Sequence, residues 1–461
     1  MPTIEINAKN FILGESSADF MPDKGFSPES YGLNLIKKRG VLYFNEAATA
    51  RHGSELSGNI IASANDHNYL GNDKYFLDDE GAFYIYSGTT LTKRQTDPSG
   101  ATWQVGTSDL LQFNLDTYAT SDDKLWVLTG SNLDSLDKVG TISLNAGFRH
   151  PMEIVEDTCY VGSKNTIYYF NNAGSTGTAF TLPTDVNVTS LRRHPDGVTL
   201  LAFCGTTGDL NAAHSRTGDG RVYYCNTRLV GVSAKGWDRE VKIESQVEGT
   251  RVVGGVVYCT WGQNFGYFHG SGLQIIKRLT TSTVTHSHQI SNLEDILMVR
   301  DGIYILFYGD LGAGRVWWNA FKNNANLEAI NCLAYIGSNK VLVAHKGDSA
   351  GTGYLYEQNF NNAGTSSASQ FVSNKYFMAE TVKADRFDII HDSSGTSAFN
   401  FQEIDDGGSI NLIHSANYAS QSVRKTKGNM DVEADILQLR LFPVSGTGIG
   451  FKYIKAHYGT I

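Results

Sequence analysis

One pair of segments shows most clearly how this chain folds: Asp301-Gly302-Ile-Tyr-Ile-Leu-Phe-Tyr308, followed closely by Gly314-Arg-Val-Trp-Trp318. Each segment opens at a glycine turn and continues as a short run of β-branched and aromatic residues, the pattern of a β-strand. The runs are nearly continuous in apolar character, and such runs are typical of strands covered on both faces. The stretch therefore predicts neighbouring strands in a sheet that is packed between other layers.

The same unit of turn and apolar run recurs along most of the chain. Further clear copies lie at 197–204 with 220–225, at 255–261 with 266–269, and at 339–345 with 353–356. Weaker copies begin at Gly81, Asp123 and Thr158. The average step is about 43 residues, within the roughly 40–50 residues of a propeller blade. Because neighbouring blades cover both faces of each sheet, we predict an all-β fold with a β-propeller of about seven blades, six or eight also being open, over residues 45–365.

Two other folds with buried strands were weighed against the propeller. Parallel α/β strands also appear as apolar runs, but helices would then lie between them, whereas the intervening stretches are rich in Gly, Ser, Thr and Asn. A β-solenoid needs a shorter and more regular step. The 48 glycines against 8 prolines, with 23 Tyr and 23 Phe, also favour tight turns between aromatic strands.

Both ends of the chain differ from the repeats. Residues 1–44 hold isolated aromatic residues between glycines and prolines, so we expect an extended N-terminal anchoring arm that docks on another surface. After the polar stretch 361–369, the pattern changes to alternation, as in Leu437-Gln-Leu-Arg-Leu441. Alternation is typical of a half-exposed sheet, so we predict a small C-terminal β-sandwich-like domain over residues 370–461.

Composition limits the classes of partner and the cellular compartment. The 38 Lys and Arg against 47 Asp and Glu give a formal net charge of −9, which disfavours tight binding of duplex nucleic acid. No C-x-x-C pair occurs, so we expect buried thiols in a protein assembled in a reducing cytoplasm. The first ten residues do not resemble a secretory leader, and no apolar run approaches the roughly 20 residues that span a bilayer. We expect no membrane insertion. The five cysteines are Cys159, Cys204, Cys225, Cys259 and Cys332.

The histidine pair His286-Ser-His288 is the candidate metal site. It places two imidazoles on one face of a strand, with His269 before them and Glu294 and Asp295 after them, ligand types that suit Zn²⁺ or Ni²⁺. No third ligand has a defined spacing, so the motif favours a solvated connector rich in Ser, Thr and His. Whether His286 and His288 bind a metal stays open. No cofactor motif occurs, and we expect none to be bound.

Residues 96–103 are close to the Asp-box of sialidases and related propellers. Gly100, Thr102 and Trp103 are in register, but Pro98 occupies the acidic position and Asp97 is displaced by one residue. An Asp-box is a structural hairpin in those families, so it supports the fold and not an activity. The arginines available for a sugar carboxylate are Arg192, Arg193, Arg216 and Arg221, and we interpret them as loop and strand-surface charges.

Adjacent acids and a tryptophan pair are the other candidates for chemistry. The acids lie at 78–80, at Asp122-Asp123 and at Asp405-Asp406. Glycoside hydrolysis needs two carboxyl groups facing each other across a cleft, whereas neighbours on a strand point to opposite faces. We interpret all three groups as hairpin tips. Trp317-Trp318 is either a sugar-stacking platform or core packing, and its apolar neighbours favour the core. We therefore expect no catalytic residues and no enzyme.

Arm, propeller and terminal sandwich together resemble the propeller-containing virion proteins of tailed bacteriophages, of the tail nozzle and tail-tip classes. The features that carry the resemblance are Tyr31-Gly-Leu-Asn34, Lys37-Lys-Arg-Gly40 and the closing hairpin of residues 439–453. The resemblance implies a structural role in a ring of identical copies in the tail, with other virion proteins as partners. It further implies assembly in the host cytoplasm and passive contact with genome DNA passing along an acidic wall.

Two further functions stay open beside the structural one. A glycan-binding propeller adhesin would use aromatic, Asn and Asp side chains at loop tips to hold a host glycan. A sialidase-like enzyme or depolymerase would need a convergent pair of acids in a cleft.

Overall fold

The computed structural model describes the chain from Thr3 to Thr460. The exceptions inside that range are 8–29, 32, 39–40, 46, 53–55, 65–73, 97–99, 130–134, 207–219, 230–235, 281–285, 312–313, 323–328, 348–352, 362–368, 394–396, 406–407, 419–420 and 447–448. Within the described residues the regular structure is all β, apart from the short 3-10 turns η1 (Thr227–Leu229) and η2 (Ser287–Gln289). None of these helical turns is long and apolar enough to cross a membrane.

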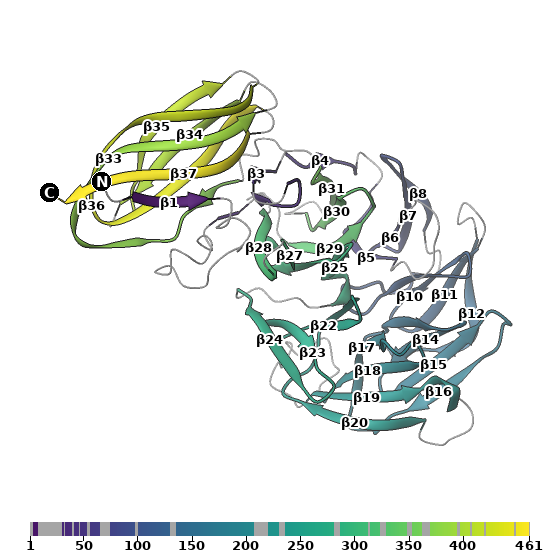
Figure 1. The fold of residues 1–461 in the computed structure, drawn as a ribbon. Helices are drawn as coiled ribbons and strands as arrows, with labels where there is room; N and C mark the ends of the chain where they lie inside the picture. The colour runs from purple at the N-terminus through teal and green to yellow at the C-terminus, as the bar shows by residue number, and fades with distance from the viewer. Residues whose placement is uncertain are drawn as a thin grey trace.

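Seven four-stranded antiparallel sheets are arranged around one axis and confirm the predicted propeller with seven blades (Figure 1). Blades 1 to 3 contain β5 (Ile60–Ser63), β6 (Lys74–Asp78), β7 (Ala82–Ser87), β8 (Thr90–Thr96); β9 (Leu110–Phe113), β10 (Asp116–Thr120), β11 (Lys124–Thr129), β12 (Ser135–Ser143); and β13 (Met152–Val155), β14 (Thr158–Ser163), β15 (Thr166–Asn171), β16 (Thr176–Thr181).

The remaining blades continue in chain order until the last. Blades 4 to 7 contain β17 (Asn187–Arg193), β18 (Thr199–Gly205), β19 (Gly220–Asn226), β20 (Trp237–Ile243); β21 (Gly249–Val253), β22 (Val256–Trp261), β23 (Asn264–Phe268), β24 (Leu273–Arg278); β25 (Ile290–Leu293), β26 (Ile296–Asp301), β27 (Tyr304–Asp310), β28 (Arg315–Lys322); and β29 (Ile330–Tyr335), β30 (Lys340–His345), β31 (Tyr354–Asn359) with β4 (Thr49–Ala50). The first strand of each blade contacts the first strand of the next, and β29 contacts β5, so the ring is closed.

A strand from the N-terminal part of the chain completes blade 7. β4 pairs with β31 as its fourth strand, and the Glu357 carboxylate on β31 secures this closure. Glu357 forms ion pairs with Arg51 at 3.2 Å and Lys340 at 3.3 Å, and it accepts a hydrogen bond from the Tyr86 hydroxyl of blade 1 at 2.6 Å. Because Glu357 is buried, these partners must satisfy its charge.

Large apolar side chains fill the spaces between blades. Trp318 of β28 is fully buried and packs edge-on against Phe307 of the neighbouring strand β27, with ring centroids 5.6 Å apart. Phe307 in turn packs against Phe360, which follows β31 of blade 7, at 5.0 Å. Phe203 of blade 4 packs edge-on against Phe268 of blade 5, at 5.7 Å. Each fully buried side chain of this size stabilises the fold by about 1.5–3 kcal/mol, so the interfaces between blades hold the ring together.

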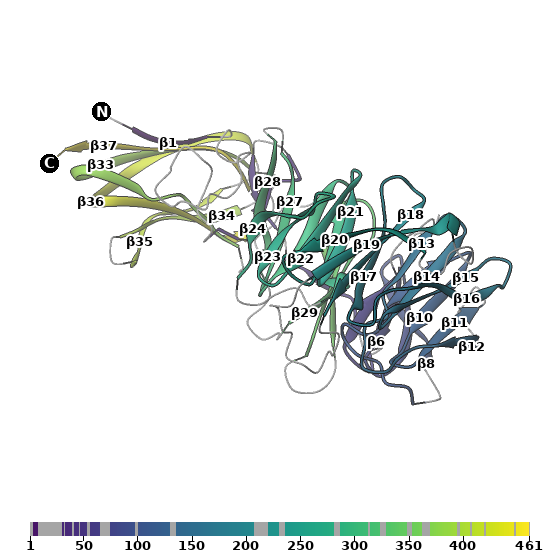
Figure 2. The same ribbon diagram turned by 90° about the horizontal axis from the view of Figure 1, so that it is seen from below.

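The C-terminal part is a two-layered sandwich whose sheets share one long strand. Its own strands are β32 (Phe371–Val372), β33 (Tyr376–Ser393), β34 (Ser397–Ile404), β35 (Ile410–Tyr418), β36 (Gln421–Gly446) and β37 (Ile449–Thr460). The first part of β36 pairs with β33, and its last part pairs with β34. Phe399 on β34 and Phe451 on β37 pack edge-on across the two layers, at 5.0 Å. The sandwich projects sideways from the rim of the propeller (Figures 1 and 2).

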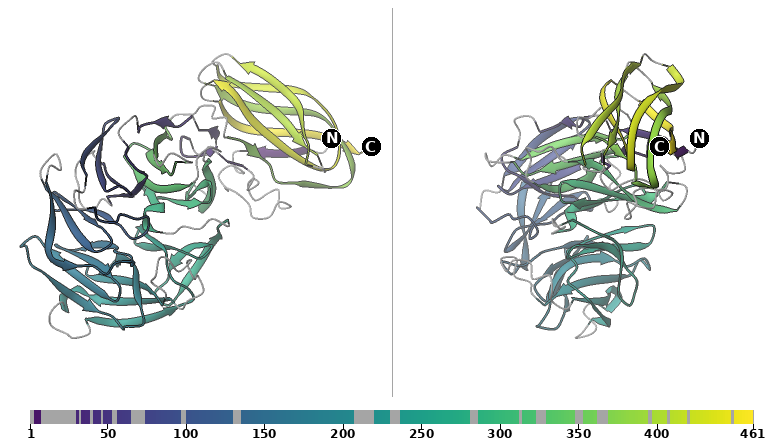
Figure 3. Two further views of the ribbon diagram at one scale, coloured as in Figure 1. Left: turned by 180° about the vertical axis from the view of Figure 1, so that it is seen from behind. Right: turned by 90° about the vertical axis from the view of Figure 1, so that its left-hand side faces the viewer.

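The described residues of the expected arm form strands of this sandwich. β1 (Thr3–Asn7) pairs with β37, and β2 (Leu33–Asn34) pairs with β3 (Leu42–Phe44), which also pairs with β37. The N- and C-termini consequently lie side by side at the far end of the sandwich (Figure 3). These described parts of the arm dock on their own chain, because β37 offers a free edge and their alternating side chains fit its core face. Residues 8–29 of the expected arm lie outside the described residues.

Segment 30–45 joins the two domains. Ser30 Oγ donates to the Val372 carbonyl at 3.0 Å on the sandwich side. Asn34 Nδ2 donates to the Phe360 carbonyl of blade 7 at 2.9 Å, and Asn45 Nδ2 donates to the Ala320 carbonyl of blade 6. Leu33, Leu42 and Phe44 belong to one continuous apolar core with blades 6 and 7 and the sandwich. The N-terminal segment therefore fixes the sandwich to the propeller.

Candidate functional site

The segment His286–Gln289, here called the plug, occupies the propeller axis near the beginning of the inner strands. It contacts blades 1, 5, 6 and 7 through their inner strands. It reaches blade 2 through His288 Nε2, which lies 2.8 Å from Asp109 Oδ1, and blade 4 through Ser287 Oγ, 3.4 Å from Ser190 Oγ. A solvated connector was expected here. That expectation is wrong for His286 and His288, which are buried at 3% and 4% exposure, because converging blades cover them.

Charges around the plug are matched. Burial by itself would raise the pKa of Asp109, but the neighbouring His288 and the hydrogen bond from the Met152 N–H outweigh burial and hold that pKa below its ordinary value. Arg149 and Glu248 form a second pair, both about 5% exposed, and Arg149 also donates to the Glu248 carbonyl at 3.1 Å. The plug end thus has the features of a structural seal.

A cavity lies further along the same inner strands than the plug. Arg192 and Arg193, which line it, follow Ser190 on β17, and Arg251 follows Thr250 on β21. The cavity has a volume of about 460 Å³. We call it the cationic cavity. Its lining residues are Glu153, Arg192, Arg193, His194, Pro195, Gly197, Arg251, Val252, Gly255 and Asn292.

Positive charge is in excess around the cationic cavity. Arg192, Arg193 and Arg251 line it, with Glu153 as the acidic lining residue. Arg192 is held in place, because it pairs with Glu153 at 3.2 Å and donates from Nε and Nη2 to the Thr250 carbonyl at 3.1 and 2.8 Å. Arg251 Nε donates to Asn292 Oδ1 at 2.7 Å.

The arginines also act on one another and on a lysine from blade 1. Burial, and then the charge of Arg192, lower the pKa of Arg251 to about 10. Burial, and then the charge of Arg251, lower the pKa of Lys74 to about 8. In both groups burial is the larger cause and a neighbouring positive charge is the smaller one.

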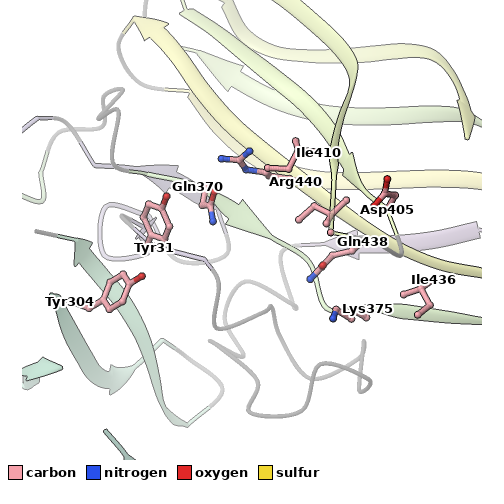
Figure 4. Close-up of a pocket in the computed structure, with 11 residues that line it drawn as sticks. Tyr31, Tyr304, Gln370, Lys375, Asp405, Ile410, Ile436, Gln438 and Arg440 are labelled. Carbon is pink, nitrogen blue, oxygen red and sulfur yellow. The ribbon is translucent and has the colours of Figure 1, made fainter. Parts of the chain in front are cut away.

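Another cavity, here called the junction pocket, lies between the propeller and the sandwich and has a volume of about 560 Å³ (Figure 4). Tyr31 and Tyr304 form its propeller side, with ring centroids 6.0 Å apart. Lys375 and Arg440 bring positive charge from the sandwich side. Its lining residues are Tyr31, Tyr304, Gln370, Lys375, Ile404, Asp405, Gly408, Ile410, Ile436, Gln438 and Arg440.

The candidate metal ligands do not gather into a site. His269 lies in an exposed turn after β23, and Glu294 lies in the turn between β25 and β26. Across the described residues, no group of three or more His, Cys, Asp or Glu side chains could hold a metal ion. His286 and His288 instead belong to the plug.

The four candidate arginines are not brought together. Arg192 and Arg193 line the cationic cavity, whereas Arg221 pairs with Asp185 at 2.8 Å at the surface of blade 4. Arg216 lies outside the described residues. Arg251, which the sequence interpretation missed, takes the neighbouring position; its sequence context is an ordinary strand, and no local signal marks it.

The acidic groups lie at hairpin tips, as predicted. Asp78 ends β6 and is fully buried; its carboxylate accepts hydrogen bonds from the Tyr84 hydroxyl at 2.6 Å and from the N–H groups of Gly58 and Ala82 at 2.9 and 2.7 Å. Burial raises the pKa of Asp78 despite these bonds. Asp123 pairs with Lys124 at 3.2 Å in the turn before β11.

The third acidic group also forms a turn. Asp405 Oδ1 accepts a hydrogen bond from the Ser409 N–H at 2.7 Å in the turn between β34 and β35. Asp406 lies outside the described residues. The carboxylates therefore stabilise turns by bonding to the backbone.

The aromatic candidates and the cysteines also have clear places. Trp318 is in the core. The Trp317 ring is half-buried, and Lys277 Nζ lies over it, 3.7 Å from the ring centroid. Trp103 of the Asp-box-like stretch packs edge-on against Phe83 at 5.6 Å, while Asp97 and Pro98 lie outside the described residues. All five cysteines are free and buried, which confirms the expectation of buried thiols.

No protein-family model matches the chain, and no curated protein matches it in sequence. Among solved structures, it is similar to a catalytically inactive virginiamycin B lyase from Staphylococcus aureus with quinupristin, with a TM-score of 0.49 and 9% identity over 68% of this chain and 98% of that chain.

Two other propellers give similar values. The WD40 domain of Neurospora crassa Pan2 has a TM-score of 0.44 and 7% identity over 65% of this chain and 89% of that chain. YCF48 bound to D1 peptide has a TM-score of 0.46 and 8% identity over 68% of this chain and 96% of that chain. The assignment of the fold rests on the seven sheets themselves.

Proposed function

We propose that the protein is a non-enzymatic structural component of a bacteriophage tail, in a nozzle, tail tip or tail-associated ring, that acts through contacts with other virion proteins. The observation that carries the proposal is the way segment 30–45 bonds to both domains and shares a core with them. This arrangement supports a single rigid unit with a propeller and a projecting sandwich. A rigid unit suits a ring in which each copy contacts its neighbours at fixed places.

The sandwich offers an apolar surface for such contacts. Ile410 and Leu412, at alternate positions of β35, are 49% and 60% exposed, and Phe377 and Val444 are 57% and 52% exposed. Ile410 and Leu412 lie on the sheet face that forms one wall of the junction pocket, opposite Ile404 and Gln402. Apolar side chains on a projecting surface favour a protein partner.

The buried carboxylates support a structural role rather than catalysis. Asp78 bonds to turn N–H groups, Glu357 closes the ring, and Asp109 holds the plug. Each of these acids has a partner that explains its burial without a substrate. In this proposal the protein is assembled in the host cytoplasm, and its net charge of −9 limits binding of passing genome DNA.

The test is the state of assembly of the full chain. We expect light scattering after size exclusion, and cryo-electron microscopy of particles that carry the protein, to find it in a symmetric ring. The double variant Ile410→Glu with Leu412→Glu should weaken assembly or incorporation. Ile275→Glu, at a 58% exposed residue of blade 5, is the matched control and should not. A protein that stays monomeric, is absent from particles and hydrolyses glycans would contradict the proposal.

A glycan-binding adhesin is the second candidate, and the junction pocket is the observation that favours it. Tyr31 and Tyr304 offer aromatic faces beside the polar side chains of Gln370, Gln438 and Asp405 (Figure 4), a combination suited to stacking and hydrogen bonding of a sugar. A glycan array with the full chain tests this function. Binding should be lost in Tyr304→Ala and kept in the control Tyr354→Ala; an array with no hits would exclude it.

A further inference from the structure

The cationic cavity carries an inference that is independent of the proposed tail function. Arg193 is exposed at the end of β17, and Arg251 is half-buried on β21, the neighbouring inner strand. Both line the same cavity of about 460 Å³, and Arg192, which precedes Arg193 on β17, also lines it and is fixed by its bonds to Glu153 and Thr250. The cavity therefore has an exposed cation, a half-buried cation and a third cation that is buried and fixed.

The side chains that line the cavity carry a net positive charge, which favours the binding of an anion. Three arginines line it and Glu153 is the acidic lining residue; that carboxylate is 1% exposed and already accepts from Arg192 and from the Ile154 N–H at 3.0 Å. Arg251 donates through Nε to the amide of Asn292, and the charge of Glu153 also acts on it. One lining carboxylate among the described residues therefore faces three lining arginines. The lowered pKa values of Arg251 and Lys74 fit the same excess of positive charge.

The rim leaves space for a ligand to enter. Gly197 and Gly255 lie in the β17–β18 and β21–β22 hairpins, with φ of 81° and 75°. A Cβ atom at either position would meet no heavy atom within 4 Å. Two glycine turns with open space beside them therefore belong to the lining of the cavity.

We propose that the cationic cavity binds an oxyanion, the phosphate or carboxylate group of a small molecule, between Arg193 and Arg251. The planar guanidinium groups supply paired N–H donors that match two oxygens of such a group. Arg192 acts as a positioning residue, because its own donors are occupied by the protein. On β17 the site lies beyond Ser190, the residue that contacts the plug.

The experiment is isothermal titration of the full chain with inorganic phosphate, at constant ionic strength set with sodium chloride. We expect saturable binding of one phosphate per chain. Arg251→Gln should weaken it at least tenfold, and Arg193→Gln severalfold. The matched control Arg221→Gln removes an arginine of the same blade that pairs with Asp185 at the surface, and it should bind phosphate as the unchanged protein does.

Repeating the titration with citrate and with N-acetylneuraminic acid distinguishes the sources of the oxyanion. Tighter binding of a carboxylate assigns the site to acidic small molecules or sugars, and tighter binding of phosphate assigns it to phosphorylated ones. Thermal unfolding of each variant without ligand shows whether it is folded. Absence of saturable binding for all three probes, or binding that Arg251→Gln leaves unchanged in a folded protein, would overturn the proposal.

Discussion

The two ends of the propeller axis are lined by the same inner strands but differ in how charge is handled. Near the beginning of the strands, Asp109 faces His288 and Arg149 faces Glu248, and the plug fills the axis. Further along, Arg192 has Glu153, while Arg193 and Arg251 add positive charge to a cavity. This difference indicates that paired charges stabilise the plug end, whereas the excess positive charge at the cationic cavity lowers the stability of the fold. Such a local loss of stability is typical of a binding site.

The largest expected effect is at the plug end. Arg149→Met leaves the Glu248 carboxylate buried without its ion partner, so we expect a loss of about 3–5 kcal/mol in the free energy of unfolding. Urea denaturation measures it. The control Arg221→Met removes a surface pair and should cost less than about 1 kcal/mol. Equal losses in the two variants would contradict the distinction between a sealed core and a surface pair.

Asp109→Asn removes the charge that faces His288 but keeps the shape of the side chain. We expect a loss of about 1–3 kcal/mol at pH 7. The pKa of Asp109 is below its ordinary value, so its stabilising effect is present above about pH 4 and declines as pH falls through the lowered pKa. The difference between the two proteins should therefore shrink in acid. Denaturation at pH 7 and below pH 4 checks this, and a difference that grows in acid would refute it.

His345 makes the strands at the plug end sensitive to acid. It is buried, and neither ring nitrogen has a hydrogen-bond partner among the described residues. Burial lowers the pKa of His345 to about 3. Between about pH 6.5 and pH 3 the unfolded chain therefore binds a proton that the folded chain does not, and stability falls as pH falls.

The variant His345→Phe removes the imidazole that binds this proton in the unfolded chain. Relative to the unchanged protein, we expect it to be about 2 kcal/mol more stable at pH 5 than at pH 7.5. The control His269→Phe changes an exposed histidine and should leave the pH dependence as it is. Parallel stability curves for the unchanged protein and His345→Phe would show that His345 does not titrate in this way.

The smallest expected effect is at the cationic end. The pKa of Lys74 is lowered to about 8 by burial and by Arg251, so its charged form destabilises the fold at pH 7, and this penalty disappears as pH rises above the ordinary lysine pKa of about 10.4. Lys74→Met should stabilise the protein by about 1 kcal/mol at pH 7, with the gain fading near pH 10. The exposed control Lys242→Met should change stability little. If Lys74→Met were less stable than the unchanged protein, other groups in the fold would stabilise the charge of Lys74, and this prediction would be wrong.

Most of the repeats visible in the sequence are the middle strands of the blades, whereas the run at 314–318 is part of the outer strand β28. The copies at 197 and 255 are β18 and β22, and those at 81 and 302 are β7 and β27. Middle strands are covered on both faces, so they are continuous apolar runs. Inner strands carry polar side chains such as Arg192 and Arg251, which bond to the neighbouring inner strands, and outer strands such as β24 are partly exposed, so neither has a pattern that stands out.

The sequence by itself determined the all-β class, a propeller of about seven blades, the buried thiols, the acidic hairpin tips and the alternation of β36, in which Leu437, Leu439 and Leu441 are buried; the exact number of blades came from the sheets of the structure. All of these depend on near neighbours in the chain and on periodicity. Only the tertiary structure decided that β4 closes blade 7, that β1 and β3 join β37, that the histidine pair is a plug, and that Arg251 joins Arg192. These contacts bring together residues far apart in sequence, and the closure of a ring leaves no local trace in the strands that it joins.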